Sequence, residues 1–381
     1  MNLKRPQNFV FQIIGLVAIS AALRFPFYAS LIHSANSRGI DPLHYPYPSW
    51  CIWDCAHYTE MSNHYNVDSV IYFPGFPWTI MGLRALLPSL TDRAAALFLS
   101  NAFSILALTL IAIFFLMLEF GEKWKNSFGK PSKTWLTLAL IAFFPGSHFW
   151  SNGYAESEQI ASLALVYILV FQKKWLWASL IAGLTALVRI QCAEITVVFG
   201  GLLVIDFMQG RGWFGTRLEN RLAGLKPWVS VLSCLFLSTP FLAFMAWQWV
   251  ERGDPLLFLH KMQTGGRPHD LWEVVRLHFP RWDLNYVLLI LSHVSAFSMI
   301  RRSGFHWKFL ALTTWILALL PLAFGGFSWG YLRYMSCSLG LFISLGEFFY
   351  SRPWFAYPWL GWSVFRLGVE VDGWTKGQWR G

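Results

Sequence analysis

Charged residues are scarce in this chain of 381 residues, at 13% of all positions against 55% that are hydrophobic. Soluble globular domains carry about 25% charged residues. The shortage argues against a soluble protein and, together with long apolar runs, predicts one that crosses a membrane several times. The net charge of +10 then gives no reason to expect nucleic acid, because membrane proteins collect positive charge in their cytoplasmic loops.

Cysteine and the motifs of cofactor-binding enzymes are also scarce. Five cysteines in so long a chain do not form a disulfide framework. No P-loop is present, and no cytoplasmic loop is long enough for a nucleotide-binding domain. No Asp-x-Asp cluster suits Mg²⁺ or Mn²⁺, and the Cys and His spacings do not suit zinc. The sequence therefore predicts neither a cofactor nor a metal site, and leaves dependence on a divalent metal open.

Apolar runs are what the chain has in abundance. About ten of them approach the roughly 20 residues that a membrane helix needs. They cover residues 9–31, 94–118, 134–150, 157–172, 175–190, 192–208, 228–249, 284–300, 307–324 and 332–350. The prediction is an all-α polytopic membrane protein of about ten transmembrane helices, with residues 1–381 forming a single integral-membrane domain.

Lys and Arg are concentrated in alternate loops of this arrangement. If the residues before the first run are cytoplasmic, the basic segments QKKW and RRSGFHWK fall on the same side, as does the tail 351–381. The excess of Lys and Arg in cytoplasmic loops then places the loop 32–93 outside the cytoplasm. Residues 70–88 look apolar enough to cross, but a crossing would reverse this bias. We expect them to lie at the interface, broken by Pro74, Gly75 and Pro77.

The outer loop 32–93 contains the most chemically varied stretch of the chain, CIWDCAHYTEMSNHY at residues 51–65. Asp54 follows a large aromatic, Trp53, and precedes a predicted helix. An Asp in that place is typically an N-cap, which accounts for the carboxylate but not for its aromatic neighbour. Function is therefore favoured over capping alone. A disulfide between Cys51 and Cys55 stays open outside the cytoplasm, although a helical stretch disfavours it.

Other ionisable residues lie at the outer ends of predicted spans. Glu156 and Glu158 begin one span, where acids either stabilise the helix dipole or belong to a site. Arg189 and Arg333 lie in apolar sequence, and a charged residue in such a place is a functional candidate by default. Pairing with Glu194 or extension toward the headgroups are the alternatives. The sequence YLRY gives Arg333 aromatic neighbours.

Five segments, read in order, resemble the PIG-V-type mannosyltransferases of the GT-C superfamily. WDCAHYTEMSNHY with VIYFPGFPWTIMGLRAL is similar to the family's first outer loop. The other four are FFPGSHFWSNGYAESEQIASLAL, AGLTALVRIQ, ERGDPLLFLHKMQ and GYLRYMSCSLGLFISLGE. Together they extend from Trp53 to Leu345. The chain departs from the family pattern at Cys55 and His64, where the family has glycine.

The resemblance implies a GT-C-like enzyme with juxtamembrane helices in the loop 32–93. Such an enzyme transfers a sugar, here mannose, from a polyprenyl-phosphate-linked donor to a lipid-linked or glycan acceptor with inversion, among membrane lipids and without a cofactor. Asp54 is the expected general base. The expected substrate-binding residues are Trp53, His57, Tyr58, Tyr154, Glu156, Arg189, Arg333 and Tyr334.

The sequence also bears on which membrane holds the protein and on alternative functions. No Asn-x-Ser/Thr sequon and no retrieval signal of the endoplasmic reticulum occur, which favours a bacterial cytoplasmic membrane. A transporter or lipid flippase is the first alternative, but such proteins place ionisable groups near the bilayer midplane. Here those groups gather at one face, which favours an enzyme. An assembly subunit with a decayed site is the second alternative.

Overall fold

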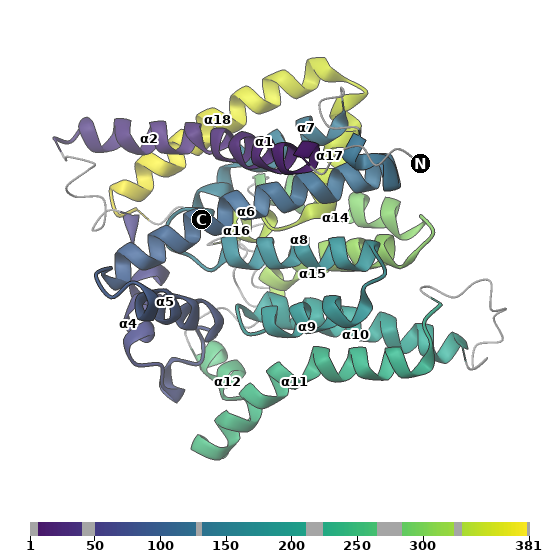
Figure 1. Ribbon diagram of the computed structural model, residues 1–381. Helices are drawn as coiled ribbons and strands as arrows, with labels where there is room; N and C mark the ends of the chain where they lie inside the picture. Colours follow the sequence, from purple (N-terminus) through teal and green to yellow (C-terminus); the bar gives the residue numbers. More distant parts are fainter. Residues whose placement is uncertain are drawn as a thin grey trace. The chain divides into compact units, whose positions relative to one another are not determined.

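The computed structural model contains only helices as regular structure in the residues it describes, which are 7–39, 50–126, 132–210, 224–264, 284–323 and 330–378. This part of the chain forms sixteen α-helices and three short 3₁₀ helices (Figure 1). The predicted all-α class is confirmed. The basic segment around Arg217 and residues 265–283 lie outside the described residues.

Contacts within the chain divide it into two compact units. Unit 1 comprises Met1–Ala56, Arg93–Ala164 and Phe342–Arg380, and unit 2 comprises His57–Asp92 and Leu165–Leu341, with Gly381. The helices of unit 1 are α1 (Gln7–Leu23), α2 (Phe25–Asn36), α6 (Asp92–Phe120), η2 (Gly121–Asn126), α7 (Lys133–Ala142), η3 (Pro145–Trp150), the first part of α8 (Glu156–Phe171), most of α17 (Leu339–Tyr350) and α18 (Pro353–Thr375).

Unit 2 contains the remaining helices. They are most of α4 (Asp54–Asn63), η1 (Val67–Ser69), α5 (Gly75–Leu86), the end of α8, α9 (Trp175–Thr185), α10 (Ile190–Gly210), α11 (Pro227–Arg252), α12 (Leu257–Thr264), α14 (Leu284–Ile300), α15 (Phe305–Ala323) and α16 (Tyr331–Met335). Helix α4 begins in unit 1 at Asp54 and continues in unit 2.

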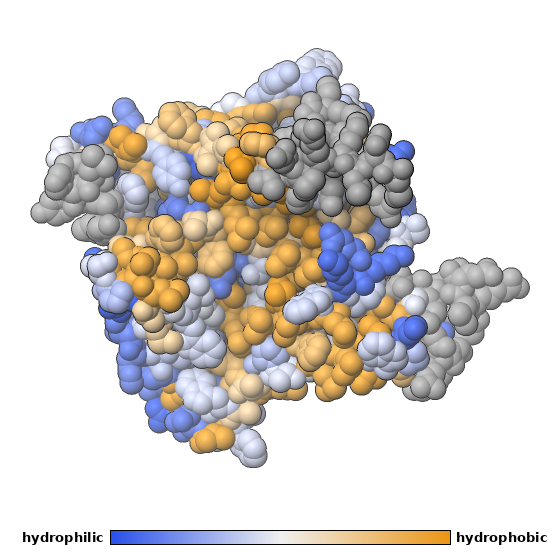
Figure 2. Space-filling model, in the orientation of Figure 1, coloured by the Kyte–Doolittle hydropathy of each residue, from blue (hydrophilic) through white to orange (hydrophobic). Residues whose placement is uncertain are grey.

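Four helices in the described part of the chain are long and apolar enough to cross a membrane: Phe11–Asn36, Asp92–Phe120, Ile190–Gln209 and Pro227–Arg252. Large apolar side chains also lie on the surface, where Figure 2 shows them over much of one face. On α11 alone Val231, Leu235 and Leu242 are half or more exposed. Apolar surface of this extent marks a membrane or protein contact, so the protein is a candidate integral membrane protein.

The expected number of about ten spans was too high by this measure. The other apolar helices have 10–17 residues, or about 15–26 Å at 1.5 Å per residue, which is less than the roughly 30 Å of a bilayer core. The run 134–150 shows the cause, because helix α7 ends at Ala142 and the chain turns into η3 at Pro145. Pro145 and Gly146 mark this break in the sequence, but the residues on both sides are apolar and the run was counted as one span.

An arginine joins α1 to α2 in the first candidate span. Arg24 is 0% exposed, and its guanidinium donates to Ser147 Oγ at 3.3 Å, to the Ser147 carbonyl at 3.0 Å and to Ser151 Oγ at 2.7 Å. A buried charge is costly unless it is hydrogen-bonded. These bonds therefore fix the junction of α1 and α2 against η3 inside unit 1.

The stretch 70–88 breaks where the sequence predicts. Helix α5 begins at Gly75, after Pro74, and has 12 residues, so it is only about 18 Å long. Pro77 lies in its first turn, where proline is tolerated. The Gly75 N–H donates to the Leu187 carbonyl at 2.7 Å. This bond holds the start of α5 against the chain between α9 and α10 in unit 2.

The chain contains one Gly-x-Gly-x-x-Gly pattern, GRGWFG at residues 210–215. In a dinucleotide-binding domain this pattern follows a strand. Here it follows helix α10, which ends at Gly210. The pattern is therefore not a dinucleotide fingerprint.

The contact at Gly75 gives a test of how unit 2 is packed. A Cβ at residue 75 would lie 2.8 Å from the Leu187 carbonyl oxygen, whereas nothing lies within 4 Å of a Cβ at Gly82 on the same helix. We expect Gly75→Ala to destabilise the protein by about 1–3 kcal/mol through overpacking. Gly82→Ala should stabilise it by about 0.5–1 kcal/mol, because alanine favours a helix interior. Melting temperatures in detergent measure both, and equal values would contradict the packing described.

Candidate functional site

Asp54 lies in a tight turn formed by residues 51–55, here named the Asp54 turn. It is the first residue of α4. Trp53 before it has φ 55°, a left-handed conformation that is uncommon outside glycine. A disulfide joins Cys51 to Cys55 and closes the turn. The expectation that a helical stretch disfavours this disulfide was wrong, because the helix begins only at Asp54 and leaves Cys51 outside it.

The hydroxyl of Tyr154 hydrogen-bonds to two residues of the Asp54 turn. The Asp54 N–H donates to Tyr154 Oη at 3.2 Å, and the Tyr154 hydroxyl donates to the Ile52 carbonyl at 3.2 Å. Tyr154 is 0% exposed, whereas Ile52 and Asp54 are half-buried, so the bonds lie at the edge of the packed interior. The structure thus brings together Asp54 and Tyr154, which the sequence assigned to one site.

The residue before Tyr154 explains why the two segments approach so closely. Gly153 has φ 75°, and a Cβ there would lie only 2.2 Å from Cys55 Sγ. Its N–H donates to Ser100 Oγ on α6 at 3.0 Å. Glycine is required here both by the backbone conformation and by the contact with the disulfide.

The side chains of the Asp54 turn differ in their accessibility. Trp53 is 46% exposed and Asp54 is half-buried, so a bound molecule can reach both. Glu156 is 1% exposed at the first residue of α8. Its place in the first turn suits the helix dipole, and its burial keeps it from direct contact with a substrate.

His57 and Tyr58 of the expected site belong to unit 2, where they follow Asp54 on helix α4. His57 is exposed and stacks on Tyr72 at 4.9 Å between ring centroids. Tyr58 is buried, with its ring edge-on to Tyr72 at 5.6 Å and to Phe76 at 5.3 Å. His57 can therefore contact a ligand, whereas Tyr58 packs α4 against α5.

The expected cationic residues also belong to unit 2. The guanidinium of Arg189 lies 5.9 Å from the ring centre of Tyr334, and its Nε donates to Gln191 Oε1 at 3.1 Å. Arg333 is 5% exposed on the short helix α16. The structure therefore brings the loop before α10 beside α16, which the sequence assigned to the same site.

A second group of charges in unit 2 comes from the segment ERGDPLLFLHKMQ. Arg252 and Lys261 both pair with Asp68, at 3.0 and 2.9 Å. The hydrogen bond from Lys261, with the charges of both cations, holds the pKa of Asp68 below its ordinary value. His260 hydrogen-bonds to Asp254 at 2.7 Å and likewise lowers the pKa of that carboxyl. These pairs fasten η1 to α11 and α12, which is a structural use of the segment.

Trp374 on α18 belongs to the surroundings of the Asp54 turn, and the sequence analysis missed it. It is 1% exposed, and its ring centroid lies 5.4 Å from that of Tyr154 and 5.5 Å from that of Phe149. Its indole N–H donates to the Trp50 carbonyl at 3.4 Å. No local pattern identifies such a residue, because it meets the site only through folding. Arg24 was also missed, although a charge within an apolar run is itself a signal.

Metal ligands and similarity to known proteins give little further guidance. Among the residues that the structure describes, no group of three His, Cys, Asp or Glu side chains could hold a metal ion. Compared with protein-family models, with curated proteins and with solved structures, the chain gives no significant match in any of the three. The resemblance to PIG-V-type mannosyltransferases therefore rests on the short ordered segments alone.

The contact between Gly153 and the disulfide gives a test of how the Asp54 turn is supported. We expect Gly153→Ala to lower the melting temperature, because it adds a clash with Cys55 to the roughly 1–2 kcal/mol cost of a left-handed alanine. Gly39→Ala is the matched control, since Gly39 has φ 67° and nothing within 4 Å of its Cβ position. Thermal unfolding of both variants in detergent isolates the clash. A Gly153→Ala variant as stable as Gly39→Ala would refute the contact.

Proposed function

We propose that this protein is a GT-C-like glycosyltransferase that moves a sugar from a polyprenyl-phosphate-linked donor to a lipid-linked or glycan acceptor. The observation that carries the proposal is the Asp54 turn. Its carboxylate is accessible, while Trp53 keeps an unfavourable backbone conformation that a disulfide and Tyr154 both restrain. Strained residues that are held from several sides cluster at functional sites.

Asp54 acts in this proposal as the general base. Its carboxylate accepts the proton of the acceptor hydroxyl, and the hydroxyl oxygen forms a bond to C1 of the sugar. The bond between C1 and the phosphate oxygen breaks, and its electron pair leaves with the polyprenyl phosphate. Attack opposite the leaving group inverts the configuration at C1. General-base catalysis of this kind is typically worth roughly 10²–10⁴-fold in rate.

Arg189 and Arg333 of unit 2 are the cations proposed to bind the leaving polyprenyl phosphate. Arg189 would stabilise the departing phosphate by charge-assisted hydrogen bonds. Arg333 is 5% exposed, so its contact with the phosphate requires the side chains that cover it to move when the donor binds. The exposed rings of Trp53 and His57 can contact a sugar face, and Tyr334 lies beside Arg189. No separate cofactor is required, since the lipid phosphate supplies the activated bond.

Three of the residues expected to bind substrate are too buried to contact it in this scheme. Tyr154 is 0% exposed and Glu156 is 1% exposed, so neither has surface for a sugar. The Tyr154 hydroxyl already bonds to both ends of the Asp54 turn. Tyr154 is therefore a positioning residue for Asp54, and Tyr58, which is equally buried, positions helix α4.

The proposed location is the extracytoplasmic face of a bacterial cytoplasmic membrane. The charge distribution of the loops supports this side for Asp54, and a donor on a polyprenyl chain requires an enzyme with its base at headgroup level. Mannose is the sugar that the resemblance suggests. Membrane lipids, the donor and the glycan or glycolipid acceptor are the proposed partners.

A membrane transporter or lipid flippase is the second candidate, supported by the four long apolar helices. A transferase releases polyprenyl phosphate, whereas a transporter does not. Purified protein in detergent, supplied with polyprenyl-phosphate mannose and an acceptor mixture from the membrane, should release polyprenyl phosphate and transfer the sugar if it is a transferase. A transporter would bind the lipid and leave the bond between sugar and phosphate intact.

Replacement of Asp54 tests the catalytic role. Asp54→Asn keeps the size and the capping ability of the side chain but removes the proton acceptor. Turnover should fall by roughly two to four orders of magnitude, with the melting temperature unchanged. Glu60→Gln is the matched control, because Glu60 is an exposed acid on the same helix. It should keep full turnover, and near-normal turnover in Asp54→Asn would exclude this residue as the base.

Replacement of Arg333 tests the phosphate contact. Arg333→Lys keeps the charge and loses the planar fork that grips a phosphate with two hydrogen bonds. We expect weaker donor binding and slower turnover together. Arg93→Lys, at an exposed position, should change neither. Donor affinity measured by equilibrium binding decides the point, and an unchanged affinity in Arg333→Lys would assign the phosphate to other cations.

A further inference from the structure

Helix α18 lies along α2 within unit 1, and the two helices run in the same direction. A Cβ at Gly368 would lie 3.4 Å from Ser30 Oγ, and one turn later Ser34 Oγ donates to Asp372 Oδ1 at 2.8 Å. Both helices advance by four residues between these contacts, which is about one turn of each. Parallel helices show this order, whereas antiparallel ones reverse it.

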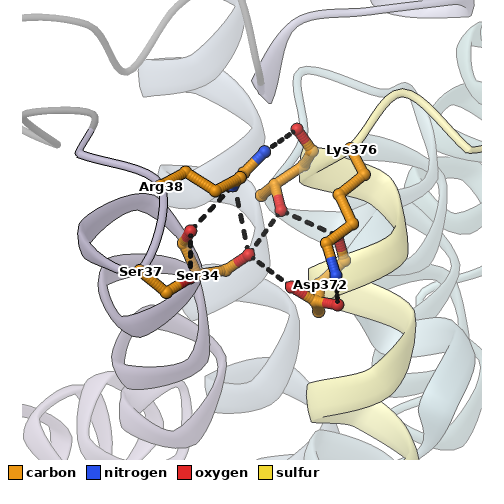
Figure 3. A network of polar contacts seen from close by, with 6 residues as sticks. Ser34, Ser37, Arg38, Asp372 and Lys376 are labelled. Atoms are coloured by element: carbon orange, nitrogen blue, oxygen red, sulfur yellow. Dashed lines mark hydrogen bonds and ion pairs between the residues drawn. The ribbon is translucent and has the colours of Figure 1, made fainter.

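The ends of the two helices are fastened together by a polar network (Figure 3). Ser34 Oγ also contacts the Thr375 hydroxyl at 2.7 Å, and Arg38 donates to the Thr375 carbonyl. Lys376 pairs with Asp372. Since α2 ends the candidate span Phe11–Asn36, the end of α18 lies at the same level as the end of that span.

The beginning of α18 lies at the opposite end of unit 1. There Phe355 packs against Phe348 at 6.4 Å, and Trp359 against Phe349 at 5.9 Å, where α17 ends. A helix of 23 residues is about 34 Å long, which exceeds the roughly 30 Å of a bilayer core. The two ends of α18 are therefore a membrane thickness apart.

The exposed side of α18 is aromatic. Its exposed side chains are Trp354 at 74%, Phe355 at 51%, Tyr357 at 73%, Trp362 at 37% and Phe365 at 67%. The neighbouring candidate span also exposes large apolar side chains, among them Phe25 at 69% and Ile32 at 45%. Because the two helices pack side by side, their apolar surfaces adjoin.

The charges within α18 explain why composition alone does not reveal a span. Arg366 and Glu370 form an i,i+4 ion pair at 2.7 Å, and the Glu370 side chain is only 4% exposed. Asp372 is bound by Ser34 and Lys376 at the helix end. A hydropathy average counts these groups as though each faced lipid alone, and it gives tryptophan little credit. Paired charges directed at protein are the form in which charges occur within membranes.

We propose that α18 is a further membrane-spanning helix, parallel to the span Phe11–Asn36, with its aromatic face in the bilayer hydrocarbon. Trp354 and Tyr357, near its start, lie at one headgroup region, where such residues concentrate. Its Thr375 end lies at the other, on the membrane face of Asn36 and the Asp54 turn. This differs from the cytoplasmic tail expected from charge for 351–381, and it does not depend on the proposed sugar transfer.

Labelling of single added cysteines tests the direction of α18. Gln378→Cys follows the helix, Ser351→Cys precedes it, and Asn36→Cys marks the end of α2; all three positions are exposed. A membrane-impermeant maleimide, applied to right-side-out and to inside-out vesicles, should label Gln378→Cys from the same side as Asn36→Cys and Ser351→Cys from the opposite side. The unsubstituted protein, treated in the same way, measures the background labelling of its own cysteines. Labelling of Gln378→Cys from the side of Ser351→Cys would overturn the proposal.

A nitroxide spin label at Phe365→Cys tests the lipid contact. In vesicles its relaxation should be faster with oxygen, which concentrates in hydrocarbon, than with a water-soluble nickel chelate. The same label at Ser351→Cys is the control and should show the reverse order. If the chelate dominates at residue 365 as well, α18 lies in water and the proposal fails, whatever the labelling of residue 378 shows.

Discussion

The hydroxyl of Tyr154 is the group on which the geometry around Asp54 depends. It accepts the Asp54 N–H and donates to the Ile52 carbonyl, and so satisfies a partly buried donor and a partly buried acceptor of the same turn. Unsatisfied buried polar groups cost about 1–3 kcal/mol each. A turn that places Trp53 at φ 55° is stable here because its backbone has partners that do not require water.

That hydroxyl is in turn positioned by packing from distant parts of the chain. Trp374 and Phe149 contact the ring of Tyr154, and Gly153 allows the approach to the disulfide. Aromatic side chains that are fully buried contribute much of the packing energy of a core. The orientation of Asp54 is therefore a property of unit 1 as a whole, including α18.

The cations of unit 2 divide between structural ion pairs and the candidate site. Arg252 and Lys261 pair with Asp68 and hold η1 against α11 and α12. Arg189 lies beside Tyr334, and Arg333 is buried on α16. Only the partners of these four cations distinguish a structural role from a candidate phosphate contact.

The sequence by itself determined the features that local chemistry controls. Helices follow from apolar composition because lipid offers the backbone no other hydrogen-bond partner. The break before α5 follows from Pro74 and Gly75, and Asp54 lies in the first turn of a helix, where an acid suits the helix dipole. Tertiary structure decided the rest, including the disulfide of the Asp54 turn and the contact of Trp374 with Tyr154. These join residues far apart in sequence or depend on a turn that leaves no periodic pattern, and a partner's position in space is fixed only when the whole chain packs.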